Sequence, residues 1–364
     1  MEPPIIQQGD ELGSHSVDET AVQNGLPLAS SSFFLKVKTV FKPSSFTCQC
    51  PRGDVDYCCE RARGWLTAVL EKEQLNNKKP NITQSQLESM RQSYTQLTRT
   101  RELSDYEDQI CKDLGRTFPR AEQFKDEAGL EALKRVLLAY SRYDKSVGYV
   151  QGMNFIAGQL LYHCQEEIAF WIFATLIESF ELRHVFERHL PGLYRHGSII
   201  DGLLRQQEPE LHGHLQELGV LVEMYASDWV ICLFASLVPL HLYADFLDAF
   251  FARGWLYFYT VCLCLLRHFK RRLLEQDEIA GVLYHIKFKS LEKRAIVFNE
   301  ATGEVEKPGL LSKLFEYIGR RLQEESAEEV WKQVLKASQQ GPLVEGATVQ
   351  QLERAFEGAH ILID

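Results

Sequence analysis

The chain has 364 residues, of which 45% are hydrophobic and 25% charged, and its formal net charge is −10. This composition is typical of a globular protein that is long enough to bury a sizeable core. The acidic balance argues against a general nucleic-acid binder and against a protein that adheres to anionic membranes, because either surface would repel the molecule. The basic run at residues 268–272 is interpreted as a solvated helix end.

Residues 1–54 are rich in Ser, Gln, Gly and Pro and are predicted to form a largely disordered extension. Within them, the hydrophobic residues 31–41 are either an added strand or a short docking motif, and the sequence does not decide between the two. No charged segment followed by an apolar core opens the chain, so no signal peptide is predicted. We therefore expect a cytoplasmic protein with reduced cysteines.

From about residue 55 onward, apolar side chains recur at helical spacing, and strand-like alternation is nearly absent. Prolines at 191, 209 and 239 separate helices of common length. The sequence predicts a single all-α domain over residues 55–325, followed by a helical tail over 326–364 that is weakly ordered from about residue 341. The longest apolar runs, 229–240 and 255–266, are too short to cross a bilayer and are predicted to be buried core helices.

Several common chemistries have no counterpart in the sequence. There is no Gly-x-x-x-x-Gly-Lys-Ser/Thr loop to hold a nucleotide and no Gly-x-Ser-x-Gly elbow. The 11 histidines form no zinc-binding pair. The cysteine cluster Cys48, Cys50, Cys58 and Cys59 does not have the spacing of a common zinc module, so free thiols are favoured over a metal site. We expect no cofactor or metal of the protein's own.

The first unusual polar motif is QICKDLGRTFPR, residues 109–120. Asp113 and Arg116 are three residues apart, so the carboxylate can reach the guanidinium at a helix end. Gly115 and Pro119 are predicted to end that helix and to place Arg116 at its exit. Alone, such a pair is more often a structural ion pair than a functional one.

The second motif is KSVGYVQGMNFIAG, residues 145–158. Residues 146–148 are predicted to start a helix that runs through residues 155–161. Gly148 and Gly152 flank Tyr149 and Gln151 and allow another backbone or a ligand to come close. Taken in isolation, a structural role is favoured, with Tyr149 packed and Gln151 capping a helix.

Together the two motifs indicate more than either does alone. A held arginine and an amide, without a nucleophile or a nucleotide site, cannot complete a reaction, but they can complete one on another protein. Hydrolysis of a nucleotide's γ-phosphate needs positive charge on the developing anion and a group that positions the attacking water. A guanidinium suits the first task because it forks onto phosphate oxygens and stays protonated.

These motifs resemble those of a known family. ICKDLGRTFP resembles the Ile-x-x-Asp-x-x-Arg motif of the TBC-domain family of Rab GTPase-activating proteins, and GYVQGMNFIAG resembles its Tyr-x-Gln motif. Upstream, Arg61-x-x-x-Trp65 is similar to an early family element, although Ala62 stands where glycine is usual. The similarity continues downstream in SDWVICLFASLVPL, residues 227–240, and FLDAFFARGW, residues 246–255, with Leu247 replacing a common tryptophan, and it spans about residues 55–290. The matching downstream residues are Trp229, Phe234, Pro239, Asp248 and Gly254.

The resemblance implies an all-α TBC-type fold and activation of GTP hydrolysis on a GTP-bound Rab-family small GTPase, in regulation of vesicle trafficking. It implies that Arg116 is an arginine finger that neutralises charge and that Gln151 is a glutamine finger that positions water. Asp113 would hold Arg116, and Tyr149 would pack beneath the Gln151 loop beside Gly152.

Further roles follow from the same resemblance. Arg61 and Trp65 would support the site. GTP and Mg²⁺ would belong to the Rab partner, and peripheral recruitment to endomembranes stays open. The alternative function is a catalytically silent TBC-fold module that binds a small GTPase or serves as a scaffold, in which a finger would normally be missing.

Overall fold

The structure is a computed structural model that describes residues 60–73, 84–100, 105–287, 298–299, 304–305, 326–340 and 344–360. The described helices follow one another along the chain as α1 (Glu60–Glu73), α2 (Gln84–Arg99), α3 (Glu107–Leu114), η1 (Glu122–Phe124), α4 (Glu127–Tyr143), α5 (Met153–His163), α6 (Glu166–Ser179), α7 (Leu182–Phe186), α8 (Pro191–Gln207), α9 (Pro209–Glu217), α10 (Glu223–Cys232), α11 (Leu240–Arg253), α12 (Trp255–Leu274), α13 (Ile279–Ile286), α16 (Ala327–Gln339) and α17 (Gly346–His360). Two-residue strands, β1 (Phe298–Asn299) and β2 (Glu304–Val305), form one antiparallel pair. The predicted all-α fold is confirmed.

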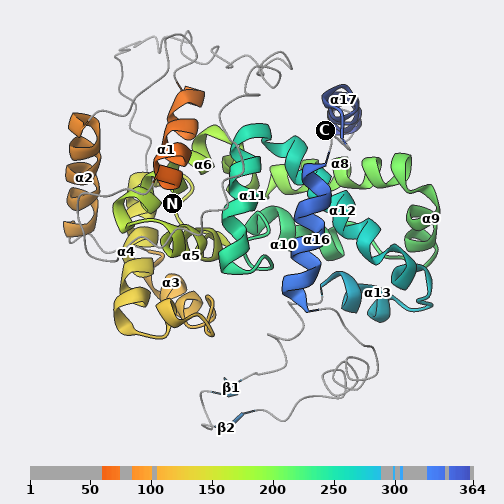
Figure 1. Ribbon diagram of the computed structural model, residues 1–364, viewed down its shortest axis with the longest axis horizontal. Coiled ribbons are helices and arrows are strands. Elements are labelled where there is room, and N and C mark those ends of the chain that lie inside the picture. The colour runs from red at the N-terminus through yellow and green to blue at the C-terminus, as the bar shows by residue number, and fades with distance from the viewer. Residues whose placement is uncertain are drawn as a thin grey trace, which may run out of the picture.

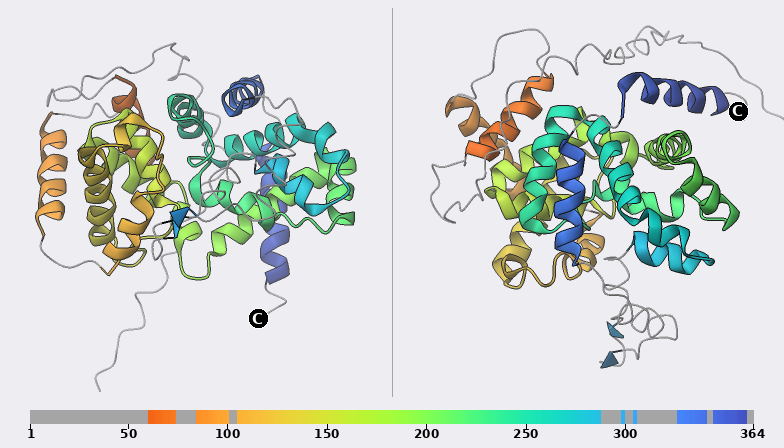
Figure 2. Two further views of the ribbon diagram at one scale, coloured as in Figure 1. Left: turned by 90° about the horizontal axis from the view of Figure 1, so that it is seen from below. Right: turned by 45° about the vertical axis from the view of Figure 1, so that its right-hand side comes forward.

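The helices gather in two groups that share one core. Figure 1 shows α1 to α6 on one side of the molecule and α8, α9, α12 and α13 on the other, with α11 and α16 between them. The view from below in Figure 2 shows the same division. Contacts of α5 with both α10 and α11 join the groups at the centre. A site carried by α5 therefore lies near the junction of the two groups.

Two helices form the apolar centre of these groups. In α6, nearly every residue from Ile168 to Ile177 is buried, and in α12 burial is continuous from Tyr257 to Leu266. A helix that is apolar on all sides is typical of the interior of a large domain, since it has no face to give to water. This confirms the prediction that residues 255–266 form a buried core helix.

The other long apolar run departs from its prediction. Residues 229–240 are mostly buried, but α10 ends at Cys232, and Leu233 and Phe234 have φ of 49° and 59°. Left-handed backbone at two adjacent residues cannot continue a right-handed helix. The sequence did not predict this break, because a continuous run of apolar residues has the same pattern in a buried helix and in a buried turn.

The helix predicted to begin at residues 146–148 also begins elsewhere. Helix α5 starts at Met153, and the residues before it form turns. Gly148 and Gly152 have φ of +65° and +115°, a region that glycine enters readily and that interrupts a helix. Residues 144–152 are thus a loop between α4 and α5, and we call this segment the Gln151 loop.

The C-terminal helices pack onto the rest of the fold. Helix α16 lies against α11 and α12, and α17 lies along α8 (Figures 1 and 2). Most of the stretch after residue 341, where weak order was expected, is α17. The extension at 1–54 and the cysteine cluster at 48–59 lie outside the described residues. In the described ranges, no helix combines the length and the apolar character that crossing a bilayer requires.

Candidate functional site

Arg116 stands on the turn that follows α3. The helix ends at Leu114, as the sequence predicts, and the backbone N–H of Arg116 donates to the Asp113 carbonyl at 3.3 Å. One guanidinium nitrogen, Nη2, lies 2.6 Å from Asp113 Oδ1. The Arg116 side chain is 47% exposed whereas that of Asp113 is 6% exposed. The carboxylate therefore fixes one edge of the guanidinium from below and leaves its other nitrogens facing solvent.

Asp113 also holds the Gln151 loop. The Tyr149 hydroxyl donates to Asp113 Oδ2 at 2.6 Å, and Tyr149 is buried. Burial, and next the hydrogen bond to Asp113, raise the pKa of Tyr149, so the hydroxyl stays protonated and acts as a donor. Both oxygens of one buried carboxylate are thus occupied, one by the Arg116 turn and the other by the loop that carries Gln151.

A second link between the same two segments was not predicted. Asn154 Nδ2 donates to Thr117 Oγ1 at 2.7 Å, and Asn154 Oδ1 accepts from the Gly152 N–H at 3.0 Å. Thr117 Oγ1 donates in turn to the Asp113 carbonyl at 2.7 Å. Thr117 and Asn154 are fully buried, and buried polar groups need partners. An asparagine inside the apolar run of α5 was the signal available in the sequence.

Gln151 itself is exposed at the end of this framework. Among the described residues, no hydrogen bond engages its side-chain amide, while its neighbours Tyr149 and Gly152 are held by the bonds above. The helix-capping role considered for Gln151 is therefore not seen, because the bond to the Gly152 N–H at the start of α5 comes from Asn154. The amide is presented outward from a fixed backbone.

Gly152 brings the loop against α10. A Cβ atom built at this position would lie 2.5 Å from Ile231 Cγ2 and 3.3 Å from Cys232 Sγ, in addition to the strained φ. Any side chain here would push α5 and α10 apart. Gln151, the neighbour of Gly152, therefore lies where the first group of helices meets α10.

We expect Gly152→Ala to lower the free energy of unfolding by about 1–3 kcal/mol, because both the φ and the contact with Ile231 oppose a methyl group. Urea denaturation of the full chain measures this change. The matched control is Gly213→Ala on α9, where nothing lies within 4 Å of the added carbon. The control is expected to be neutral or slightly stabilising, and equal losses in the two variants would contradict the role given to Gly152.

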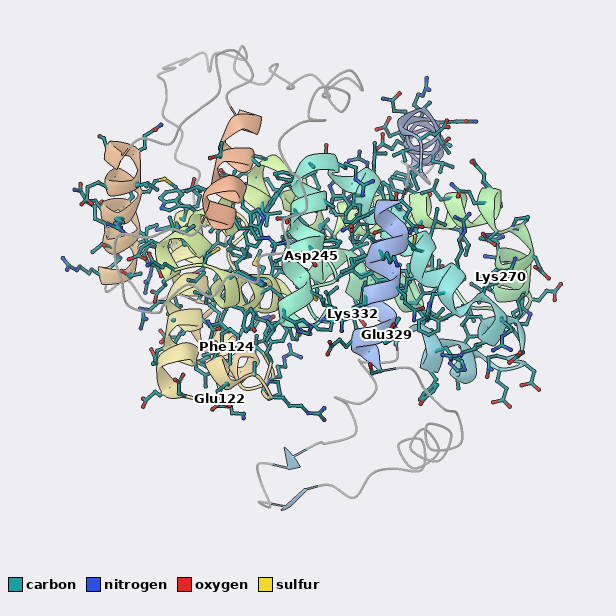
Figure 3. All side chains as sticks on the ribbon, in the orientation of Figure 1. Glu122, Phe124, Asp245, Lys270, Glu329 and Lys332 are labelled. Atoms are coloured by element: carbon teal, nitrogen blue, oxygen red, sulfur yellow. The ribbon has the colours of Figure 1, made fainter. Side chains whose placement is uncertain are left out.

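Arg61 and Trp65 occupy a different place from the other predicted site residues. Both lie on α1, and their side chains bond Asp248 of α11: Arg61 Nε at 3.1 Å from Oδ2 and Trp65 Nε1 at 2.6 Å from Oδ1. Arg61 also pairs with Asp245, labelled in Figure 3, at 2.6 Å. No described contact joins Arg61 or Trp65 to Gln151. In the structure, the two side chains hold α1 against α11.

The two positions that depart from the family pattern are both in the core. Ala62 is 2% exposed and Leu247 is fully buried. They lie on α1 and α11, the two helices that Arg61, Trp65 and Asp248 fasten together. The two substitutions therefore lie where α1 packs near α11, and neither belongs to the segments that carry Arg116 and Gln151.

The site offers an exposed guanidinium, paired within the described residues with Asp113, and an exposed amide that can both donate and accept hydrogen bonds. In the described part of the chain, no group of three or more His, Cys, Asp or Glu residues is arranged to hold a metal ion. Arg116 can bind the oxygens of an anion, and Gln151 can orient a water molecule or a polar group beside it.

Comparison with protein families gives a match over this part of the chain. The profile of the Rab-GTPase-TBC domain matches residues 58–274, which include α1 to α12 and both polar motifs. The matched range begins just before α1 and ends with α12. It therefore contains every residue that the sequence assigned to the site.

Similar proteins carry related names. The Rab GTPase-activating protein eat-17 of Caenorhabditis elegans is 32% identical over 214 residues, 58% of this chain and 24% of that protein. The ecotropic viral integration site 5 ortholog of Drosophila melanogaster is 36% identical over 170 residues, 46% of this chain and 21% of its own length. The chain thus spans only about a fifth to a quarter of the length of these relatives.

A solved structure shows the same fold. The crystal structure of the Chlamydomonas flagellar RabGAP TBC domain superposes with a TM-score of 0.54 at 24% identity, covering 76% of this chain and 78% of that one. At this identity the likeness establishes the arrangement of helices and nothing finer.

Proposed function

Because the chain belongs to the Rab-GTPase-TBC domain family, we propose that it accelerates hydrolysis of the GTP bound to a Rab-family small GTPase. The observation that carries the proposal is the buried Asp113 carboxylate, which binds Arg116 through one oxygen and Tyr149 of the Gln151 loop through the other. A single anchor thus sets the relative position of an exposed cation and an exposed amide.

In the proposed mechanism, the two groups act on a reaction centre supplied by the partner, which holds GTP and Mg²⁺. The Arg116 guanidinium donates to oxygens of the γ-phosphate as charge develops there, and its ion pair with Asp113 limits the motion that must be lost on docking. The Gln151 amide orients the attacking water. Neither group changes its protonation state or forms a bond, so the chain provides positioning and electrostatic stabilisation only.

The exposure of both groups leaves them accessible to a partner of protein size. Arg116 is half exposed, and within the part of the chain that the structure describes Gln151 has no side-chain hydrogen bond to break before it engages water. Action on a Rab GTPase would place the chain in vesicle trafficking, with at least transient residence at the membranes that carry GTP-bound Rabs.

The full chain, purified and added in catalytic amount to a panel of GTP-loaded Rab GTPases, is expected to raise phosphate release from at least one of them. An arginine finger in trans contributes on the order of 10³–10⁵ in rate, so the increase should be far above background. If one or more Rabs bind the chain yet none responds, the alternative holds and the chain is a silent TBC-fold binding module. If none responds or binds, activation of Rab GTPases is wrong, and the alternative is reduced to a scaffold or to binding of a small GTPase outside the Rab family.

A further inference from the structure

The turn that leads into the Gln151 loop is held by Asp144. This residue follows α4 and is 8% exposed. Its Oδ1 accepts hydrogen bonds from the Ser146 N–H at 3.1 Å, the Ser146 hydroxyl at 2.6 Å and the Val147 N–H at 3.3 Å. Its carbonyl accepts from the Gly148 N–H at 2.8 Å. One residue therefore fixes the backbone of 146–148, immediately before Tyr149.

The second oxygen of Asp144 is held from a different helix. Arg183 of α7 pairs with Asp144 Oδ2 and also donates to the Ser146 hydroxyl at 2.9 Å. The Tyr140 hydroxyl donates more weakly to the same Oδ2, at 3.3 Å. The Arg183 side chain is 34% exposed and that of Asp144 is 7% exposed. Arg183 thus binds the turn through both Asp144 and Ser146, although it lies 39 residues after Asp144 in the sequence.

Further contacts restrict the backbone conformation of the turn and of the residues that follow it. Gly148 has φ of +65°, and a Cβ at this position would lie 2.2 Å from the Tyr106 ring, so the backbone is packed directly against an aromatic face. Beyond it, Tyr149 and Gly152 are fixed by Asp113 and Asn154. The only outward side chain between these anchors that carries an amide is Gln151. Its orientation depends on anchors at both ends of the loop.

We propose that Arg183 and Asp144 are positioning residues for Gln151: their ion pair locks the 144–148 turn and thereby sets where the amide meets the attacking water. This inference rests on the proposed function. Neither residue contacts the reacting atoms, and each acts through the backbone of the loop. Misplacement of a catalytic group by about 1 Å can lower a rate by about 10²-fold, so a pair remote from the reaction can matter for it.

The test replaces Arg183 by methionine, which keeps the aliphatic stem and removes the charge and both donors. Arg267→Met is the matched control, because Arg267 is 33% exposed, pairs with Glu208 at 2.6 Å and also donates to Gln207 at 3.1 Å. Lys270 binds the same Glu208 and lies at the opposite edge of the molecule from Glu122 and Phe124 (Figure 3). The control therefore removes a comparable ion pair between α12 and the start of α9, in the group of helices opposite α4 and α5, which the Gln151 loop connects (Figure 1).

Amide hydrogen exchange of the full chain gives the first readout, without any partner. In Arg183→Met, the amides of Ser146, Val147 and Gly148 are expected to exchange at least about tenfold faster than in wild type, because the acceptor Asp144 is released. Arg267→Met should leave these amides unchanged. Unchanged exchange in Arg183→Met would overturn the inference.

Kinetics on a responsive Rab give the second readout. Arg183→Met is expected to lower kcat by roughly tenfold or more with KM changed less than about twofold, and Arg183→Lys should recover part of the loss. In a Gln151→Ala background the same Arg183→Met change should cost less than about twofold, since the group it positions is gone.

The two proposals fail in different ways. In the first case, wild type activates a Rab, but Arg183→Met has the same kcat as wild type, or lowers kcat by the same factor in the wild-type and Gln151→Ala backgrounds. The positioning role is then wrong and the proposed function stands. If wild type activates no Rab, the proposed function is wrong and the positioning role falls with it, whatever the exchange data show.

Discussion

Arg116→Ala should abolish nearly all activation of a responsive Rab, lowering the activated rate of GTP hydrolysis by about 10³-fold or more. The reason is that Arg116, held through one nitrogen on the buried Asp113 carboxylate, is the cation that the proposed mechanism directs to the γ-phosphate. The measurement is single-turnover phosphate release at saturating wild-type or variant chain. Affinity for the GTP-loaded Rab should change far less, since most of a protein interface lies outside one side chain.

Two further variants separate a finger from a local charge. Arg116→Lys keeps the charge but lacks the planar fork, so it should restore only a small part of the rate. Arg120→Ala removes an exposed arginine four residues further along and should leave the rate within about twofold of wild type. Thermal unfolding monitors stability, because removal of Arg116 leaves the Asp113 carboxylate with Tyr149 as its one side-chain partner among the described residues. A rate near wild type in Arg116→Ala would refute the assignment.

Gln151→Ala is expected to lower the activated rate by on the order of 10², the scale seen when one positioned hydrogen-bonding group is removed from a reaction centre. Its effect on stability should be negligible, because the side chain is exposed and makes no hydrogen bond within the described residues. The same single-turnover assay measures the rate, and a melting curve checks the fold.

Matched substitutions test whether the amide itself is needed. Gln151→Glu has nearly the same shape but brings negative charge toward a phosphate and loses the donor, so it should be at least as impaired as Gln151→Ala. Gln96→Ala on α2 removes an exposed glutamine elsewhere and should have no effect. If Gln151→Glu retained full activity, the water-positioning role would be wrong, and a loss in Gln96→Ala would point to an unspecific cause.

The Arg116 half of the site could be predicted from the sequence because it is local. Asp113 and Arg116 are one helical turn apart, and the residues after Leu114 favour a helix end, so the ion pair and its exit position follow from short-range rules. The all-α fold was predictable for a similar reason, since apolar residues recur at helical spacing along much of the domain and strand-like alternation is nearly absent.

The contacts that join distant segments were not predictable in this way. Thr117 and Asn154 are 37 residues apart, and Arg61 and Asp248 are 187 apart. Pairings over such separations are set by how helices pack, which a single sequence does not encode in its spacing. Family resemblance named Arg61 and Trp65 as supporting residues, but it gave no contact partners, so their bonds to Asp248 could not be foreseen.

The prediction that a helix begins at residues 146–148 was wrong for a different physical reason. Residues 146–148 look like a helix beginning, yet Gly148 and Gly152 adopt positive φ and Asp144 caps the turn instead. The sequence does not specify the φ of a glycine, because glycine adopts positive and negative φ about equally well. The packing decides it, here against Tyr106 at Gly148 and against Ile231 at Gly152.

The packing of α16 has a practical consequence for work on fragments. Trp331 of this helix is fully buried with its ring 5.4 Å from that of Phe234, and the Ser338 hydroxyl donates to Tyr257 at 3.0 Å. A recombinant fragment cut at residue 274, where the family match ends, would leave these aromatic faces open to water and prone to self-association. Fragments intended for crystallisation or assay should extend through residue 339, the end of α16.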